Sequence, residues 1–328
     1  MIVQLAQSLG KKSKIPFDMF ALEKSADDAR RHDKLRHIYH RGQDLAWDGR
    51  EVLNELIAKH GGIHVPPAKA KALRKVFEII LWGELAAWKV SAELADEITA
   101  LEPKMAATAQ AHDEARHFYV MYDYLKLLGY TPTRIDPFSQ RVLDVTLGAK
   151  RLAHKLLGMQ LMLETIALTI FAEVRESRVE PVLSDLLLYY EKDEARHVGL
   201  GTQFLPTLLR RQKGWDAAET MLFQFRLLFW SIASLKTMER DLHELGISAP
   251  HLIERGKEIQ IKAFDELWKQ TGAEPVGNEQ INRVLNGLDA AIFPGVDVEV
   301  DFFGRVKRFM KAASRPSREG MNPAHAGV

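Results

Sequence analysis

Two seven-residue segments of this chain share their five central residues, and this repeat constrains the fold more than any other feature. The copies read HDEARHF and KDEARHV, and their glutamates, Glu114 and Glu194, are 80 residues apart. Glu84 and Glu164 are separated by the same interval, and each precedes the glutamate of its DEARH segment by 30 residues. The chain therefore contains a duplicated pair of elements, and each copy carries the same acidic and imidazole side chains.

Hydrophobic residues recur about every 3.6 positions along nearly the whole chain, and proline and glycine are confined to a few breaks. This spacing is typical of amphipathic helices, and no stretch alternates β-branched residues as a strand would. We therefore expect an all-α fold. The expected helices cover residues 21–41, 49–60, 68–101, 104–128, 140–177 with a break near Gly148, 181–211, 216–245, 250–270 and 278–292.

These helices are expected to form one domain over residues 1–311, because the chain is long enough to bury a large core. Both sets of glutamates fall within about residues 68–211, so a bundle of four long helices would occupy that region, with flanking helices on both sides. Residues 312–328 are rich in Ser, Arg, Pro and Gly, and we expect a disordered tail there.

The composition excludes several classes of function. Lys and Arg number 45 against 44 Asp and Glu, which leaves a net charge of +1 and no field to attract nucleic acid or an anionic membrane. The chain has no cysteine, which excludes disulfides, thiolate zinc sites, iron–sulfur clusters and cysteine nucleophiles. Any metal must therefore be held by carboxylate and imidazole groups.

Two of the repeated glutamates lie in strongly apolar surroundings. Glu164 is in the middle of LLGMQLMLETIALTIFA, and Glu84 follows FEIILWG and precedes LAAW. Burying a carboxylate without a partner costs several kcal/mol, so a positive group must meet each of them in the core. An arginine or lysine from a neighbouring helix is one candidate for that group, and a metal cation is the other.

Helix geometry favours the cation. Residues three apart project from the same face of a helix, so Glu114 and His117 form one chelating pair, and Glu194 and His197 form another. At a rise of about 1.5 Å per residue, a turn halfway between two residues 30 apart brings them to the same level. Four carboxylates and two imidazoles at one height of a bundle suit two divalent ions of the iron or manganese type.

On these residues the chain resembles the ferritin-like di-iron carboxylate superfamily, in which two helices supply one Glu each and two supply Glu-x-x-His. The doubled Asp-Glu-x-Arg-His is most similar to the oxygen-activating members, such as the hydroxylase subunits of bacterial multicomponent monooxygenases, the acyl carrier protein desaturases and the arylamine N-oxygenases. The resemblance implies a ferritin-like four-helix bundle with additional flanking helices.

The resemblance also implies six metal ligands. These are Glu84, Glu114, His117, Glu164, Glu194 and His197. They would hold two iron ions, or iron together with manganese, and O2 would be a co-substrate. Glu84 and Glu164 would lie beside the organic substrate.

Charged residues next to the ligands are implied to orient them. Asp113 would accept a hydrogen bond from the outer nitrogen of His197, and this contact fixes the imidazole tautomer and raises its basicity. Asp193 would do the same for His117. The residues that would balance the two buried aspartates are Arg116 and Arg196.

Four residues are candidates for the wall of a substrate pocket. Trp88 and Leu168 each lie one turn after a repeated glutamate, and Gln160 lies one turn before Glu164, although such side chains also serve as core. Tyr190 stands where the arylamine oxygenases have an extra histidine, and Leu168 stands where the aromatic monooxygenases have a threonine. The sequence therefore departs from both subfamilies.

The leading hypothesis from the sequence is an O2-dependent di-iron oxygenase or hydroxylase that acts on a small, largely apolar organic substrate. Since no dinucleotide-binding motif is present, two electrons per turnover would come from a separate reductase or ferredoxin. The alternative is a ferroxidase or another iron-handling protein of the ferritin kind, and a helical scaffold with a vestigial site is a third reading. Hydroxylation, N-oxygenation, desaturation and cleavage all remain open.

The chain shows no signals for export or for a membrane span. The lysines near the N-terminus follow its apolar residues, which is the reverse of the order in a signal peptide. The apolar stretches 156–172 and 221–235 are interrupted by Glu164 and Arg226 and are shorter than a span requires. We therefore expect a cytoplasmic protein that binds neither membranes nor nucleic acid, and a homodimer is compatible with the sequence.

Overall fold

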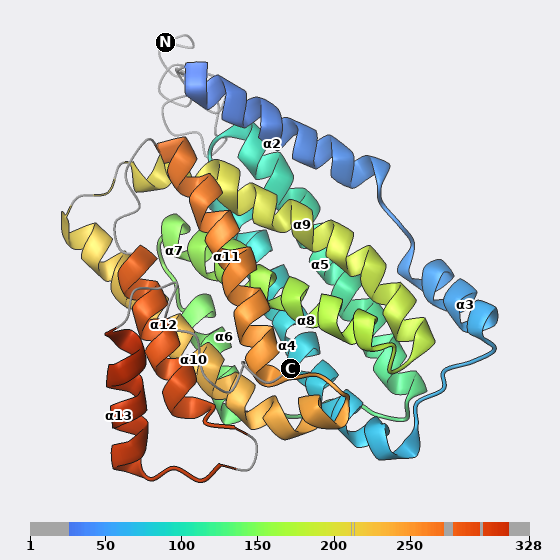
Figure 1. The fold of residues 1–328 in the computed structure, drawn as a ribbon. Helices are drawn as coiled ribbons and strands as arrows, with labels where there is room; N and C mark the ends of the chain where they lie inside the picture. Colours follow the sequence, from blue (N-terminus) through green and yellow to red (C-terminus); the bar gives the residue numbers. More distant parts are fainter. Residues whose placement is uncertain (1–25, 211, 213, 272–277, 296–297, 315–328) are drawn as a thin grey trace.

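The computed structural model describes residues 26–210, 212, 214–271, 278–295 and 298–314, and every regular element among them is a helix (Figure 1). The predicted all-α class is therefore confirmed. In chain order the elements are α2 (Ala26–Asp44), α3 (Gly49–His60), α4 (Pro67–Glu97), α5 (Leu101–Leu127), α6 (Pro137–Leu147), α7 (Leu152–Leu156), the π-helix η2 (Leu157–Leu163), α8 (Glu164–Ser177), α9 (Pro181–Leu209), α10 (Gly214–Glu244), α11 (Ala249–Thr271), α12 (Asn278–Ile292) and α13 (Phe302–Ala313).

Four long rods form a bundle at the centre of the molecule. α4 packs along α5, α8 packs along α9, and α5 contacts α9 (Figure 1). The third rod is composite, because α7, η2 and α8 follow one another without a break. The links from α4 to α5 and from α8 to α9 are short, so each of these pairs of helices is antiparallel.

The remaining helices cover the bundle. α2 packs on α5 and α9, α10 on α4 and α6, and α11 on α8 and α9, while α12 and α13 pack on each other (Figure 1). Large side chains such as Phe77, Leu94 and Phe171 are fully buried between these layers. Each contributes about 1.5–3 kcal/mol relative to an exposed position, so the interior of the bundle is the main source of stability.

Most predicted helix ends lie within about one turn of the observed ones where the described residues allow a comparison. The helices predicted at 49–60 and 278–292 match α3 and α12 at both ends. The break expected near Gly148 within the helix predicted at 140–177 is confirmed, because α6 ends at Leu147 and the next helix begins at Leu152.

Pro103 lies between the helices predicted at 68–101 and 104–128, but it does not end the first of them. α4 stops at Glu97 because Ile98 adopts an extended backbone, and Pro103 lies in the first turn of α5. A proline is tolerated there because the N–H groups of a first turn have no acceptors within the helix.

The sequence pattern does not predict η2, which lies directly before Glu164. The backbone N–H of Glu164 donates to the carbonyl of Met159, five residues back instead of four. The helices around η2 pack closely against it. A Cβ on Gly201 of α9 would lie 2.9 Å from the Cβ of Gln160, and a Cβ on Gly158 would lie 2.9 Å from the Phe223 ring. The wide turn that positions Glu164 therefore depends on two glycines.

One continuous helical stretch, Leu152–Ser177, is long and apolar enough to cross a membrane by length and composition alone. In this fold 67% of its most apolar window is buried. A position in the core of the bundle accounts for that apolar composition.

The predicted tail begins too early. α13 continues to Ala313, because its apolar residues pack on α12, so residues 312 and 313 are helical. Residues 315–328, like residues 21–25 of the first predicted helix, lie outside the described residues.

Gly201→Ala tests the close packing around η2. We expect it to lower the free energy of unfolding by about 1–3 kcal/mol, the usual cost of overpacking a core contact. Gly83→Ala in α4 is the control, because a Cβ at that position meets nothing within 4 Å, and it should raise stability by about 0.5–1 kcal/mol. Denaturant unfolding followed by circular dichroism measures both variants, and an equal effect of the two would contradict the packing argument.

Candidate metal centre

Six side chains from four helices converge inside the bundle. They are Glu84 from α4, Glu114 and His117 from α5, Glu164 from α8, and Glu194 and His197 from α9. None of the six is more than 5% exposed. The repeat in the sequence therefore corresponds to one buried cluster of four carboxylates and two imidazoles.

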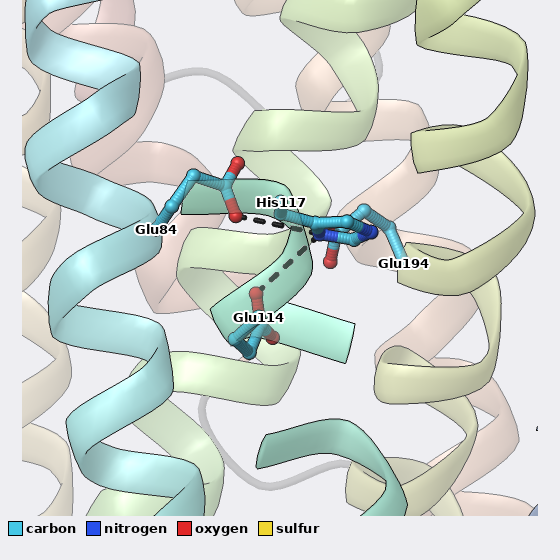
Figure 2. A group of neighbouring side chains, drawn as sticks. All are labelled: Glu84, Glu114, His117 and Glu194. Atoms are coloured by element: carbon cyan, nitrogen blue, oxygen red, sulfur yellow. Dashed lines mark ion pairs between the residues drawn. The ribbon is translucent and has the colours of Figure 1, made fainter. Parts of the chain in front are cut away.

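The cluster consists of two overlapping groups, and the potential ligand atoms in each lie within 4.8 Å of one another. Glu114 and Glu194 belong to both groups and are called the shared carboxylates below. Two carboxylates shared in this way could bridge two ions. The first group is Glu84, Glu114, His117 and Glu194 (Figure 2), and the second is Glu114, Glu164, Glu194 and His197.

The inner nitrogen of each imidazole faces the carboxylates. His117 Nδ1 lies 3.1 Å from Glu194 Oε1, 3.4 Å from Glu84 Oε2 and 3.6 Å from Glu114 Oε2 (Figure 2). In the second group, His197 Nδ1 lies 2.9 Å from Glu194 Oε2 and 3.0 Å from Glu114 Oε1. Each imidazole thus contacts both shared carboxylates.

Three buried atoms of the cluster have no hydrogen-bond partner, namely Glu114 Oε2, His117 Nδ1 and Glu194 Oε1. Each unpaired buried group costs about 1–3 kcal/mol, and groups of this kind are rare in protein cores. Carboxylate oxygens and imidazole nitrogens are ligands that suit iron and manganese. The residues present therefore fit a pair of divalent ions.

Each imidazole is oriented by an aspartate from the opposite DEARH segment. His117 Nε2 donates to Asp193 at 3.1 Å, and His197 Nε2 donates to Asp113 at 3.4 Å. This is the pairing that the resemblance implied. Because the outer nitrogen carries the proton, the inner nitrogen of each ring is directed at the glutamates as a potential ligand.

Two arginines neutralise these aspartates. Arg116 contacts Asp113 at 2.6 Å and Asp193 at 2.8 Å. Arg196 contacts Asp193 at 2.6 Å and Asp113 at 3.0 Å. Burial alone would raise the pKa of both aspartates, but their histidine and arginine partners outweigh it and hold each pKa below its ordinary value. The aspartates and arginines together add no net charge to the centre.

Sequence reasoning missed two residues that contact the cluster. Trp47, in the link between α2 and α3, donates its indole N–H to Asp193 at 2.8 Å. Gln110 donates to Glu114 at 2.9 Å and to Glu164 at 3.1 Å. The one-turn spacing of Gln110 from Glu114 could have identified it, whereas Trp47 lies outside the repeat and carries no such signal.

Without metal, the cluster retains protons. Burial raises the pKa of Glu84 to about 8, although the nearby His117 acts against this shift. Burial and the shared carboxylates raise the pKa of Glu164 well above its ordinary value. For His117 and His197 burial lowers the pKa, but the surrounding carboxylates outweigh it and both pKa values lie well above the ordinary range. Divalent ions would displace these protons.

An apolar cavity of about 210 Å³ adjoins the cluster at Glu84 and Glu164. Its wall is built from α4, α6, η2, α8, α10, α11 and α12, and most of it is aliphatic. The described residues that line it include three with charged side chains, which are Glu84, Glu164 and Lys257. A mostly apolar cavity with a few polar groups is the usual form of a small-molecule site.

Trp88 and Leu168, which were predicted to line a substrate pocket, are not among the residues that line this cavity. At about 100° per residue, the lining residue Ala87 lies on one side of Glu84 and Trp88 lies on the other. The same rotation separates the lining residue Ala167 from Leu168. Residues one turn from a glutamate share its helix face, whereas the cavity is lined by the adjacent face of each helix.

Gln160 and Tyr190 are also absent from the cavity wall, although both are fully buried. The side-chain amide of Gln160 lies 3.3 Å from the amide oxygen of Gln110. The Tyr190 hydroxyl donates to the carbonyl of His117 at 2.6 Å, and its ring stacks on that imidazole with 4.2 Å between centroids. Gln160 therefore contacts a hydrogen-bond partner of the cluster, and Tyr190 contacts a member of it.

The sequence matches no protein-family model and no curated protein. The fold is similar to the solved structure of a Synechococcus protein with aldehyde deformylating oxidase activity, with a TM-score of 0.53 and 17% sequence identity. The match covers 64% of this chain and 94% of that chain. At this identity the similarity shows the fold, so the predicted ferritin-like bundle with additional flanking helices is confirmed.

The stability of the metal-free protein should fall as the pH rises from about 6 to about 8.5. Folding raises the pKa of Glu84, Glu164, His117 and His197, so the folded state holds protons that the unfolded chain releases. Stability is therefore lost as the pH approaches the folded pKa values, by up to about 1.4 kcal/mol per pH unit for each proton. Glu84→Gln and Glu164→Gln should each reduce the slope. Denaturant titrations in chelator at several pH values measure it, and stability that rises over this range would contradict the assignment.

Proposed function

We propose that this protein is an O2-dependent di-iron oxidoreductase of the oxygenase or hydroxylase type, acting on a small, largely apolar organic substrate. The observation that carries this proposal is the buried Glu/His cluster beside an apolar cavity, with Glu84 and Glu164 common to both. The similarity to a protein with aldehyde deformylating oxidase activity supports it, since that protein has the same type of bundle.

The ions would be two irons, or iron together with manganese. Bound in the cluster, they would supply the redox chemistry that reduces O2 and oxidises the substrate. The proposed ligands are Glu84, Glu114, His117, Glu164, Glu194 and His197.

The side chains of this protein position the reactants. Glu84 and Glu164 lie between the cluster and the cavity, so a molecule in the cavity meets the centre at these two carboxylates. The mostly aliphatic wall would surround the apolar body of the substrate. Asp113 and Asp193 retain the outer imidazole protons and thereby keep the inner nitrogens directed at the centre.

We propose that the electrons come from a separate protein. The chain has no cysteine for an iron–sulfur cluster, and its sequence has no dinucleotide-binding motif. Two electrons per turnover would therefore come from a reductase or ferredoxin that docks on this protein.

Metal loading tests the proposed centre. After anaerobic incubation with Fe(II) and removal of free iron, we expect about two iron ions per chain by elemental analysis. Glu164→Ala should retain about one, because Glu164 belongs only to the second group. Glu55→Ala, at an exposed position on α3, is the control and should retain both. Metal content in Glu164→Ala equal to wild type would show that the ligand assignment is wrong.

Oxygen consumption separates the proposed oxidoreductase from a ferroxidase. With O2 and a chemical reductant, the proposed enzyme consumes O2 over many turnovers at a constant iron content. A ferroxidase would instead consume O2 in proportion to added Fe(II) and accumulate ferric product, and that outcome would overturn the proposal.

A further inference from the structure

The cavity contains a charged group that the proposed metal centre does not use. Lys257 on α11 lines it, and the neighbouring lining residues Leu252, Ile253 and Leu285 are aliphatic. The Lys257 side chain is only 17% exposed. A cation in an apolar wall is costly unless acceptors meet it, so its partners indicate its role.

The nearest polar partners of Lys257 come from α12, and Glu254 of its own helix adds a carboxylate charge, but part of its hydrogen-bonding capacity is unused. Its Nζ donates to Asn286 Oδ1 at 3.0 Å and lies 3.6 Å from Asp289 Oδ2, which is beyond hydrogen-bond distance. An ammonium group has three N–H donors, so donors remain for a molecule in the cavity. Burial lowers the pKa of Lys257 while Asp289 and Glu254 oppose this shift, and an anion in the cavity would further stabilise the charged form.

Lys257 lies at a distance from the metal centre that a small molecule can span. The preceding residue, Gly256, lies against Thr169, since a Cβ placed on it would be 3.6 Å from the Thr169 hydroxyl. Thr169 follows Glu164 by five residues on α8, a rise of about 7.5 Å. A molecule held by Lys257 can therefore extend along α8 toward Glu164.

The cavity volume limits the size of such a molecule. An apolar cavity of roughly 150 Å³ holds one benzene ring. In proportion, this cavity of about 210 Å³ accommodates about eight non-hydrogen atoms, which matches an apolar chain of eight carbons. This is the size of a medium-chain or simple aromatic carboxylic acid.

We propose that Lys257 binds the carboxylate of the substrate, so that the cavity takes a small monocarboxylic acid whose apolar body extends toward Glu84 and Glu164. Oxidation would then occur at a carbon remote from the carboxylate. The oxidation rests on the function proposed above, whereas carboxylate binding in the cavity does not.

Isothermal titration of the metal-free full chain with octanoate, octan-1-ol and octylamine tests the proposal. The three probes share a chain and differ in the charge of the head group. We expect octanoate to bind at least about tenfold more tightly than octan-1-ol, and octylamine to bind most weakly. Equal affinities for octanoate and octan-1-ol would overturn the proposal.

Variants at Lys257 locate the binding group. Lys257→Gln and Lys257→Met should each weaken octanoate binding at least about tenfold and leave octan-1-ol binding within about twofold. Lys262→Gln, at an exposed position of the same helix, is the matched control and should change neither affinity. Retention of the octanoate preference in both Lys257 variants would contradict the assignment.

A measurement on the wild-type protein covers the case in which neither Lys257 variant folds. Octanoate should protect Lys257, but not Lys262, from reductive methylation, as detected by peptide mass spectrometry. Methylation of Lys257 that is unchanged by saturating octanoate would refute the proposal. Metal content is measured separately. Carboxylate binding without metal uptake would contradict only the proposed di-iron function. Metal uptake without a preference for the carboxylate would contradict only the proposed role of Lys257.

Discussion

Four carboxylates share a small volume in the interior of an apolar bundle, and the rest of the structure is arranged to neutralise them. His117 and His197 face them directly, and each imidazole is in turn held by an aspartate. Those aspartates are balanced by two arginines and so bring no excess charge inward. Without metal, protons retained on the imidazoles and on Glu84 and Glu164 reduce the repulsion. The four rods of the bundle must remain in register for this arrangement to persist.

The cluster was predictable because it follows from local periodicity. Residues three apart share a helix face whatever the tertiary structure, and Glu84 and Glu114 reach one level because a short link folds α4 back on α5. Conversely, η2 was not predictable, because its wide turn depends on contacts with Gly201 and Phe223, which lie on other helices. Trp47 was missed for the same reason, since only the packing of the α2–α3 link brings it to Asp193.

The position of the cavity shows where periodicity stops being informative. The sequence shows which faces of α4 and α8 carry Glu84 and Glu164. Which adjacent face lines the cavity depends on how α10, α11 and α12 pack. Lys257 is an example, because its position eight residues into α11 does not indicate that it lines a space next to α8. Substrate-binding residues in such a fold are therefore determined by how the flanking helices dock.

The metal cluster and the cavity are each unfavourable for folding without ligands, and they lie side by side. Buried ligand atoms without a hydrogen-bond partner and an apolar space without packing contacts are each unfavourable. Ligands that bind only the folded state would offset both costs at one place, since binding stabilises a fold in proportion to the logarithm of ligand concentration over its dissociation constant. The adjacency of the two destabilising features thus favours a centre that binds metal and substrate together over a vestigial site in a structural scaffold.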